Sequence, residues 1–374
     1  MGQWNEAKIG EIAEVKGGKR IPKGRKLIKE PNSHPYIRIR NLGKTKYLQL
    51  NADYEYVDEE TQQMIAQYIV NQGDILISVV GTIGLVGIVG NTLDKANQTE
   101  NCDKIINIKK VLSEYLYYYL VSSFGQDEIK KGTVGAVQPK LPLKNVKDIT
   151  VKYPPIIEQK QIVEILSAID EKIELNETIN NNLEQQAQAI YQQMFIENQN
   201  PNWKEGKLSD LVAVKYGKDH KKLDGGCYPV YGSGGIMRYV EKPLYTGESV
   251  LIPRKGTLNN VMYVNGAFWS VDTMFYTEML RPNIAKFVYH FVKGKDLASL
   301  NAGSAVPSMT TNILNAMPLY VPDDETLSIF EETVTPMYSQ MQENEKQSAN
   351  LANIRDTLLP RLMSGELEVS DIDL

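Results

Sequence analysis

The sequence predicts a mixed α/β protein, in which two tandem-repeated domains are joined by two long antiparallel coiled-coil helices and related by a pseudo-twofold axis. Three observations support this fold class. An opening block recurs near the middle of the chain, each half ends in a segment with heptad periodicity, and strand-like segments separated by turns precede both helices. At 374 residues the chain is long enough for two domains of ordinary size.

The repeat is clearest where each half begins. Trp4 to Lys19 reads WNEAKIGEIAEVKGGK, and Trp203 to Lys218 reads WKEGKLSDLVAVKYGK, with seven identities in sixteen positions and no gap. Two shorter matches follow: GDILISVVGT with GESVLIPRKGT, beginning at Gly73 and Gly247, and AVQP with AVP, beginning at Ala136 and Ala305. We therefore interpret the chain as a tandem duplication whose loops have diverged.

Inside the two domains, short runs that are rich in β-branched or alternating apolar residues predict strands. They are YIRIR from Tyr36, GDILISVV from Gly73, SVLIP from Ser249, AFWSVDTMFY from Ala267 and MPLYVP from Met317. Helices are predicted over Ser113 to Ser123 and over Asn283 to Lys293. Their aromatic residues are interpreted as core residues rather than as groups that stack on bases: Tyr115, Tyr117, Tyr118, Tyr119, Phe287, Tyr289 and Phe291.

Each repeat ends in a predicted helix of coiled-coil type, because apolar residues recur there at alternating steps of four and three. The two seams correspond position by position at a constant offset and without a gap, with polar residues at the same central steps. They are Ile162, Leu166, Ile169, Ile173, Asn176, Asn180, Leu183, Ala187, Ile190 and Met194, and Phe330, Val334, Met337, Met341, Asn344, Ser348, Leu351, Arg355, Leu358 and Leu362. Such stripes also occur on helices packed against their own domain, but the matched register favours two helices that pack on each other.

Prolines mark the joints between these segments. Pro154 and Pro155 precede the first helix, Pro201 follows it, and Pro322 opens the second. The expected order is a domain over residues 1–155, a helix over 156–197, a second domain over 198–322, a second helix over 323–368 and a tail over 369–374. Forty helical residues span about 60 Å, so two such helices would hold the domains apart.

The net charge of −5 conceals a strong asymmetry along the chain. Residues 157–197 carry a net charge of −6 and residues 323–374 carry −9, so the rest of the chain carries +10. Acidic helices and basic domains predict that different surfaces meet different partners.

The basic residues concentrate just after each opening block. They are Lys16, Lys19, Arg20, Lys23, Arg25, Lys26 and Lys29 in the first half, and Lys215, Lys218, Lys221 and Lys222, with His220, in the second. A charge run is usually a solvated face, but recurrence at the same point of both repeats favours contact with DNA phosphates.

Side chains with forked or amide donors are candidates for reading bases. Those nearest the basic loops are Arg38, Arg40, Asn41, Arg254, Lys255, Asn259 and Asn260. Thr82 in a GTIG turn, with Tyr231 and Ser233 in a YGSGG turn, completes the candidate DNA-binding set. The YGSGG turn fits a close approach to a phosphate and a plain hairpin equally well.

No catalytic or metal-binding constellation is predicted. The chain contains neither an Asn-Pro-Pro-Tyr motif nor a Walker A pattern, and Glu158 and Lys160, spaced as in some nucleases, fall on the first predicted helix. Cys102 and Cys227 are far apart, which indicates neither a disulfide framework nor a zinc site. We find no signal peptide and no apolar stretch long enough to span a membrane, so a cytoplasmic protein is expected.

The whole chain resembles the specificity (S) subunits of type I restriction-modification systems. The likeness rests on the Trp-x4-Leu/Ile blocks, YIRIRNL from Tyr36, GTIG around Thr82, YPVYGSGG from Tyr228 and, most specifically, RDTLLPRLMSGEL from Arg355 to Leu367. The resemblance implies a non-catalytic protein with two target-recognition domains, each reading one half of a bipartite site on double-stranded DNA. It also implies central helices that dock two methyltransferase (M) subunits and, through them, restriction (R) subunits. S-adenosylmethionine and ATP would belong to those partners, and this chain would hold no cofactor.

The second helix departs from its twin, because Pro336 lies inside it and Arg355 replaces a small apolar seam residue. Both argue against a straight, symmetric second helix. Two alternatives stay open: a catalytic DNA methyltransferase or nuclease with unrecognised motifs, and a DNA-binding module of a single-chain restriction enzyme.

Overall fold

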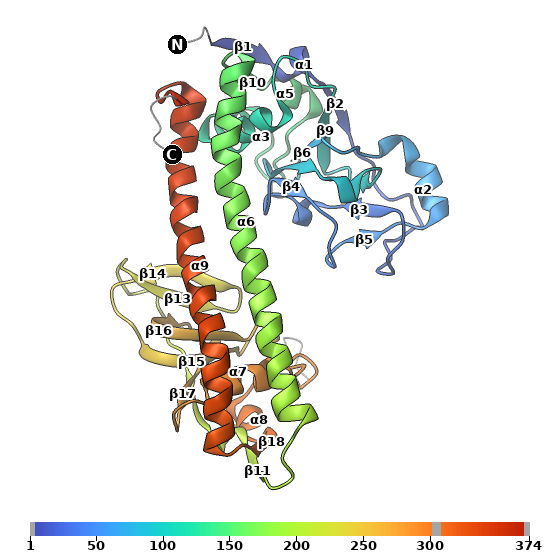
Figure 1. Ribbon diagram of the computed structural model, residues 1–374. Coiled ribbons are helices and arrows are strands. Elements are labelled where there is room, and N and C mark those ends of the chain that lie inside the picture. The colour runs from blue at the N-terminus through green and yellow to red at the C-terminus, as the bar shows by residue number, and fades with distance from the viewer. Residues whose placement is uncertain (1–3, 301–307, 370–374) are drawn as a thin grey trace. The chain divides into compact units, whose positions relative to one another are not determined.

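The computed structural model describes residues 4–300 and 308–369, and the chain forms two compact units. Unit 1 is built from Met1–Leu175 and Lys346–Leu374, and unit 2 from Asn176–Glu345. Each unit therefore combines one sequence repeat with parts of both long helices, α6 (Ile156–Gln192) and α9 (Asp324–Ser364) (Figure 1).

The repeated opening blocks fold in the same way. Residues 5–17 form β1 (Asn5–Lys8), α1 (Ile9–Ile12) and β2 (Glu14–Gly17), and residues 204–216 form β11 (Lys204–Lys207), a 3-10 turn (Leu208–Asp210) and β12 (Val212–Tyr216). Each first strand pairs antiparallel with the strand that leads into a long helix: β1 with β10 (Thr150–Tyr153) and β11 with β18 (Pro318–Val321). The sequence repeat is thus a structural repeat.

Unit 1 contains a five-stranded sheet in the order β2-β9-β6-β7-β4 and a three-stranded sheet in the order β5-β3-β8. The remaining strands are β3 (Pro35–Ile37), β4 (Tyr47–Leu48), β5 (Glu55–Tyr56), β6 (Ile75–Ser78), β7 (Val86–Val89), β8 (Asn97–Gln98) and β9 (Cys102–Ile106). The helices are α2 (Glu59–Ile65), α3 (Ser113–Val121), α4 (Ser123–Gly132) and α5 (Leu143–Asp148), with 3-10 turns at Ile39–Asn41, Ala66–Tyr68 and Asn91–Leu93.

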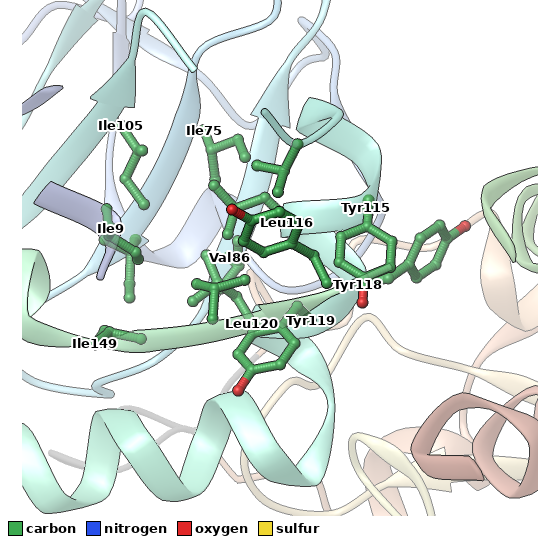
Figure 2. Packing of buried hydrophobic residues seen from close by; sticks show 14 of the residues in the cluster. Ile9, Ile75, Val86, Ile105, Tyr115, Leu116, Tyr118, Tyr119, Leu120 and Ile149 are labelled. Atoms are coloured by element: carbon green, nitrogen blue, oxygen red, sulfur yellow. The ribbon is translucent and has the colours of Figure 1, made fainter. Parts of the chain in front are cut away.

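The main core of unit 1 lies between α3 and one face of the five-stranded sheet. Tyr115, Tyr118 and Tyr119 are buried there beside Ile75 and Ile105 from the sheet (Figure 2). This confirms that the aromatic residues of the first predicted helix are core residues. Burial of apolar surface at about 25 cal/mol per Å² makes such a cluster the main stabilising feature of the unit.

Unit 2 repeats this plan with a six-stranded sheet in the order β12-β17-β15-β16-β13-β14. Its strands are β13 (Tyr228–Gly232), β14 (Gly235–Val240), β15 (Tyr245–Pro253), β16 (Met262–Ser270) and β17 (Met274–Met279), and its helices include α7 (Ala285–Lys293) and α8 (Thr311–Asn315). The first four strands correspond in order to β2-β9-β6-β7 of unit 1. Phe287, Tyr289 and Phe291 of α7 are buried in the core, as predicted.

Three predicted elements differ from the structure. Arg38 and Arg40 leave the strand after Ile37 and enter a 3-10 turn, because the Asn41 side chain accepts a hydrogen bond from the Arg38 N–H at 2.8 Å. The run from Ala267 contains a turn between β16 and β17, closed by the Met274 N–H on the Val271 carbonyl at 2.9 Å. The predicted helix over Ser113 to Ser123 ends at Val121, and Ser122 then caps a further helix, α4.

The predicted helical seams are confirmed, because all twenty seam residues are buried or half-buried. In unit 2 the polar layer joins the two helices. The Asn344 Nδ2 donates to the Asn180 Oδ1 at 2.8 Å, the Asn180 Nδ2 to the Met341 carbonyl at 3.1 Å, and the Asn176 Nδ2 to the Asn344 carbonyl at 3.4 Å. Residue numbers rise along one helix as they fall along the other, so these segments are antiparallel. Each helix also packs on a domain, so the seam residues contact both the other helix and the domain cores.

The two departures in the second helix are accommodated. Helix α9 continues through Pro336, where the missing N–H removes one backbone hydrogen bond, and the neighbouring Val334 and Tyr338 are buried in the core. In unit 1 the Arg355 Nη1 pairs with the Asp170 Oδ1 at 3.0 Å, and the Asp170 Oδ2 accepts a hydrogen bond from the Tyr118 hydroxyl at 2.7 Å. The seam arginine therefore has a carboxylate partner on α6.

Within residues 4–300 and 308–369, none of the helices combines the length and apolar character that crossing a membrane requires. Cys102 is buried and Cys227 is exposed, and both are free thiols. The described residues also contain no group of three or more His, Cys, Asp or Glu side chains placed to hold a metal ion.

Candidate nucleic-acid interface

Each basic loop leaves its sheet at a glycine. Any other residue at that position would require the neighbouring backbone to move. A Cβ atom on Gly18 would lie 2.1 Å from the Thr99 carbonyl oxygen, and one on Gly217 would lie 2.0 Å from the Val271 carbonyl oxygen. The next residue then hydrogen-bonds across the gap. The Lys19 N–H donates to the Gln98 carbonyl at 3.2 Å, and the Lys218 N–H donates to the Ser270 carbonyl at 2.8 Å. The two loops begin with the same geometry.

In unit 1 the structure brings four of the predicted DNA-binding residues to one open depression of about 820 Å³. Arg20 comes from the basic loop, Arg38 and Arg40 from the 3-10 turn after β3, and Thr82 from the turn between β6 and β7. The turn at Thr82 is held by the Ser78 hydroxyl, which donates to the Thr82 carbonyl at 2.6 Å. Segments that are well separated in the sequence therefore form one surface that carries three arginines.

Carboxylates orient the arginines of this depression. Glu55 Oε2 accepts hydrogen bonds from the Arg38 Nη1 at 2.6 Å and the Arg40 Nη2 at 3.0 Å, and Arg40 also donates to the Asp53 carbonyl at 2.9 Å. Arginine presents planar, forked donors, which match the acceptor pair on guanine or the oxygens of a phosphate. The two guanidinium groups are half-exposed, so their remaining N–H groups are available to a ligand.

Arg20 is paired with a second carboxylate. Its Nε lies 2.5 Å from the Glu100 Oε1, and its side chain is largely exposed. Partial burial is the largest single influence and raises the pKa of Glu100, but the hydrogen bonds from Arg20, the Glu100 backbone and Thr99, together with the Arg20 charge, outweigh it and hold that pKa below its usual value. Exposed ion pairs contribute only about 0–1 kcal/mol, so exchanging such a partner for a phosphate or a base costs little.

The first basic cluster does not act as one surface. Lys19 lies over the Tyr68 ring at 5.4 Å, whereas Lys16 pairs with Glu14 at 3.0 Å on β2. Arg25 instead reaches the N-terminal end of α2, where it pairs with Glu60. The same loop also contains Lys23, Lys26 and Lys29. None of these three lysines lines the depression, and no ion pair is described for them. The Asn41 side-chain oxygen already accepts the Arg38 N–H, as described above, so Asn41 has a structural role in this turn.

In unit 2 the YGSGG segment is the turn of the β13–β14 hairpin. The Asn260 Nδ2 donates to the Ser233 carbonyl at 2.8 Å, which ties the hairpin to the loop after β15. A Cβ atom on Gly256 would lie 2.7 Å from the Ser233 Oγ, so the two segments are in close contact. Tyr231 is half-buried and packs edge-on against Phe268, which removes most of its ring from a surface role.

The other candidates in unit 2 are placed separately. The Arg254 guanidinium lies over the exposed Tyr216 ring at 5.4 Å, and the Lys255 backbone forms a bridge with Ser308. Lys221 and Lys222 lie in the turn after Lys218. Asn259 uses both ends of its amide locally: the Nδ2 donates to Asp296 at 3.0 Å, and the Oδ1 accepts the Ala298 N–H at 2.9 Å.

Sequence reasoning missed two features of this surface. Glu55 and Glu100 carry no motif, and nothing in the local sequence links them to arginines in other segments. The second feature is a basic segment, residues 130–147, that contains five lysines and no acidic residue. The five lysines form a charge run in the sequence, but the second repeat has no matching basic segment that would have drawn attention to it.

Comparisons with known proteins agree with this architecture. The family model described as "Type I restriction modification DNA specificity domain" matches residues 1–185 and 200–350. The type I restriction enzyme MjaIX specificity subunit of Methanocaldococcus jannaschii is 24% identical over 99% of this chain and 94% of its own length. The HindI specificity subunit of Haemophilus influenzae is 21% identical over 98% of this chain and its full length.

Among solved structures, the S subunit of a type I restriction-modification system from M. genitalium has the same fold. It superimposes with a TM-score of 0.58 at 19% identity, covering 96% of both chains. The family match extends over both sequence repeats and most of the two helices. The chain therefore belongs to the type I restriction-modification DNA specificity family and contains two domains of that kind.

Proposed function

We propose that this chain is the non-catalytic DNA-recognition subunit of a type I restriction-modification complex. Each of its two domains reads one half of a bipartite site on double-stranded DNA. The gap between the half-sites is set by the two long helices, whose seams match at a constant offset. We further propose that the protein acts in the cytoplasm, where its DNA target lies.

One observation carries the proposal: Arg20, Arg38, Arg40 and Thr82 converge on one open depression in unit 1. The arginines combine exposed, forked donors with carboxylate partners that fix their direction. Phosphate contacts supply affinity and base-edge contacts supply choice of sequence, and a guanidinium serves both. Within the domains, this arrangement fits a duplex better than it fits a small anionic ligand, because the depression is open and its arginines are spread over several segments.

The partner proposal rests on the helices. Segments 157–197 and 323–374 carry net charges of −6 and −9, which disfavours contact with DNA and favours contact with other proteins. We propose that these helices dock two methyltransferase subunits and, through them, restriction subunits. S-adenosylmethionine and ATP would then be bound by the partners and not by this chain.

The test is a methyl-transfer assay with labelled S-adenosylmethionine. The purified chain alone should transfer no label to DNA, and addition of the matching methyltransferase should produce transfer that depends on the DNA sequence. In that complex, Arg38→Ala should reduce discrimination at one base pair about 5- to 150-fold, which corresponds to the roughly 1–3 kcal/mol of a good arginine–guanine pair. Methyl transfer by the chain alone, or sequence choice by the methyltransferase without this chain, would refute the proposal.

A further inference from the structure

Residues 133–140 form an ordered hairpin that none of the assigned contacts explains. The Val134 and Lys140 backbones exchange two hydrogen bonds of 2.9 Å, and Gly135, Ala136, Val137, Gln138 and Pro139 lie between them. Gly135 has a φ of +94°, and a Cβ atom there would lie 2.9 Å from the Gln138 carbonyl, so the tight turn requires glycine. The base is fixed to the turn after β6, because Lys140 bridges Val80 and the Leu141 N–H donates to the Val79 carbonyl at 2.9 Å.

The tip of this hairpin presents an apolar side chain to solvent. Val137 is 94% exposed, and Val134 and Val80 at the base are also exposed. Single exposed apolar residues are common on protein surfaces. This one is unusual because it lies at the end of a turn held at both sides, where a small polar residue would serve the fold equally well.

The sequence segment around Val137 is cationic. Residues 130–147 contain Lys130, Lys131, Lys140, Lys144 and Lys147 and no acidic residue. Among the residues that the structure describes, only Lys131 of these five forms an ion pair, with Glu128 at 2.6 Å. Such a surface attracts a polyanion.

The hairpin also adjoins the arginine depression of unit 1. Val80, which bridges to Lys140, is followed directly by Gly81 and Thr82, and Thr82 lines the depression with Arg20, Arg38 and Arg40. A similar element recurs in sequence: Ala136-Val137-Gln138-Pro139 in the first repeat and Ala305-Val306-Pro307 in the second, although the surrounding loops have diverged. The second copy lies outside the described residues, so the two copies are compared by sequence alone.

We propose that this hairpin enters a groove of the bound duplex, with Val137 in apolar contact with base edges and the flanking lysines on the adjacent phosphates. Proteins use apolar side chains at such places to contact thymine methyl groups or to wedge against base steps. The proposal rests on the proposed function, since it assigns a further contact to the same DNA-facing surface of unit 1. It makes the valine, and not only the arginines, a determinant of binding.

The test uses the full chain with its methyltransferase and two duplexes, one carrying the site found by methylation mapping and one of scrambled sequence. Val137→Asp places a negative charge against the DNA and should weaken binding to the site at least tenfold. Val137→Ser removes the apolar contact alone and should weaken it several-fold. Met64→Asp is the matched control, because Met64 on α2 is also an exposed apolar residue, at 54%, and its variant should bind within twofold of the parent. All three variants should melt within about a degree of the parent, since these side chains are exposed.

The outcomes distinguish a failure of the hairpin inference from a failure of the proposed function. If the parent complex prefers its site but Val137→Asp binds as Met64→Asp does, the hairpin inference is wrong and the proposed function stands. If Val137→Asp keeps its DNA affinity in excess methyltransferase but no longer co-elutes with that subunit in gel filtration, the hairpin contacts protein and the inference is wrong. If the parent complex does not distinguish the two duplexes, the proposed function fails and the inference fails with it.

Discussion

The buried histidine of unit 2 gives a stability prediction that the structure makes quantitative. His290 on α7 is fully buried, with its Nδ1 2.7 Å from the Gln188 Oε1 and its Nε2 2.8 Å from the Tyr338 hydroxyl. Its ring stacks on Tyr191 at 5.4 Å. Burial, assisted by the nearby Lys293 charge and opposed by Glu184, lowers the pKa of His290 from 6.5 to about 4.

Because the folded protein holds this imidazole neutral, the unfolded chain binds more protons between pH 6.5 and pH 4. The contribution of His290 to stability is therefore complete above about pH 6.5 and is lost as the pH falls toward 4. From the two pKa values, lowering the pH from 7 to 5 should destabilise unit 2 by about 2 kcal/mol through this group alone.

Urea unfolding at pH 7 and pH 5 measures this effect, in a Trp4→Phe background so that only Trp203 and Trp269, both in unit 2, report by fluorescence. The comparison variant is His290→Gln, whose amide cannot titrate but still offers hydrogen bonds to its two partners. Between the two pH values the parent should lose about 2 kcal/mol more than the variant. Carboxylates elsewhere titrate in both proteins and cancel. Equal losses would show that His290 is not held neutral by the fold, and the reasoning would be refuted.

Three further predictions follow from the interface and the helices. Charge reversal at Lys19, Arg20, Lys23 and Arg25 should weaken binding to every DNA sequence. It should also flatten the plot of log affinity against log salt concentration, by about one unit of slope per lost phosphate contact. An unchanged slope in a salt titration would exclude phosphate contacts for these four residues. Asn344→Leu should destabilise unit 2 by about 1–3 kcal/mol in urea unfolding, because the Asn180 Oδ1 loses the hydrogen bond from the Asn344 Nδ2. Leucine at both Asn180 and Asn344 should recover most of that loss, and no recovery would contradict the hydrogen-bonded layer. A heptad added to both α6 and α9 preserves the seam phase and adds about 10 Å, so the unspecified gap should widen by about three base pairs. The accompanying rotation of about 100° about the duplex lowers affinity; an active variant with the original gap would show that the helices do not set it.

The helices and the duplication could be predicted because their signals are local and repeated. Ile162 and Phe330 stand at matching seam positions in the sequence, and the structure buries both. The same periodicity placed Asn180 and Asn344 in a central polar layer, where they hydrogen-bond to each other. Heptad patterns report which face is buried without any knowledge of the fold.

The arginine surface could be predicted only in part. Charge and donor chemistry identified Arg20, Arg38 and Arg40, but their carboxylate partners depend on contacts between distant segments. Glu100 is far from Arg20 in the sequence, and its loop is brought to the depression by the pairing of β8 with β3 and of β9 with β2, and by the hydrogen bond from the Lys19 N–H to the Gln98 carbonyl. The 3-10 turn at Arg38 was missed for a different reason, because YIRIR has the composition of a strand and one hydrogen bond to Asn41 overrides it.

Methylation mapping in cells shows whether each domain reads one half of the DNA site. Cells carrying this chain and its matching methyltransferase should methylate a bipartite site, with two short specified halves and an unspecified gap. Introducing Arg38→Ala and Arg40→Ala together, both in unit 1, should relax one half of that site and leave the other half and the gap unchanged. A single continuous site, or a change in both halves, would contradict the account of two domains that read DNA independently.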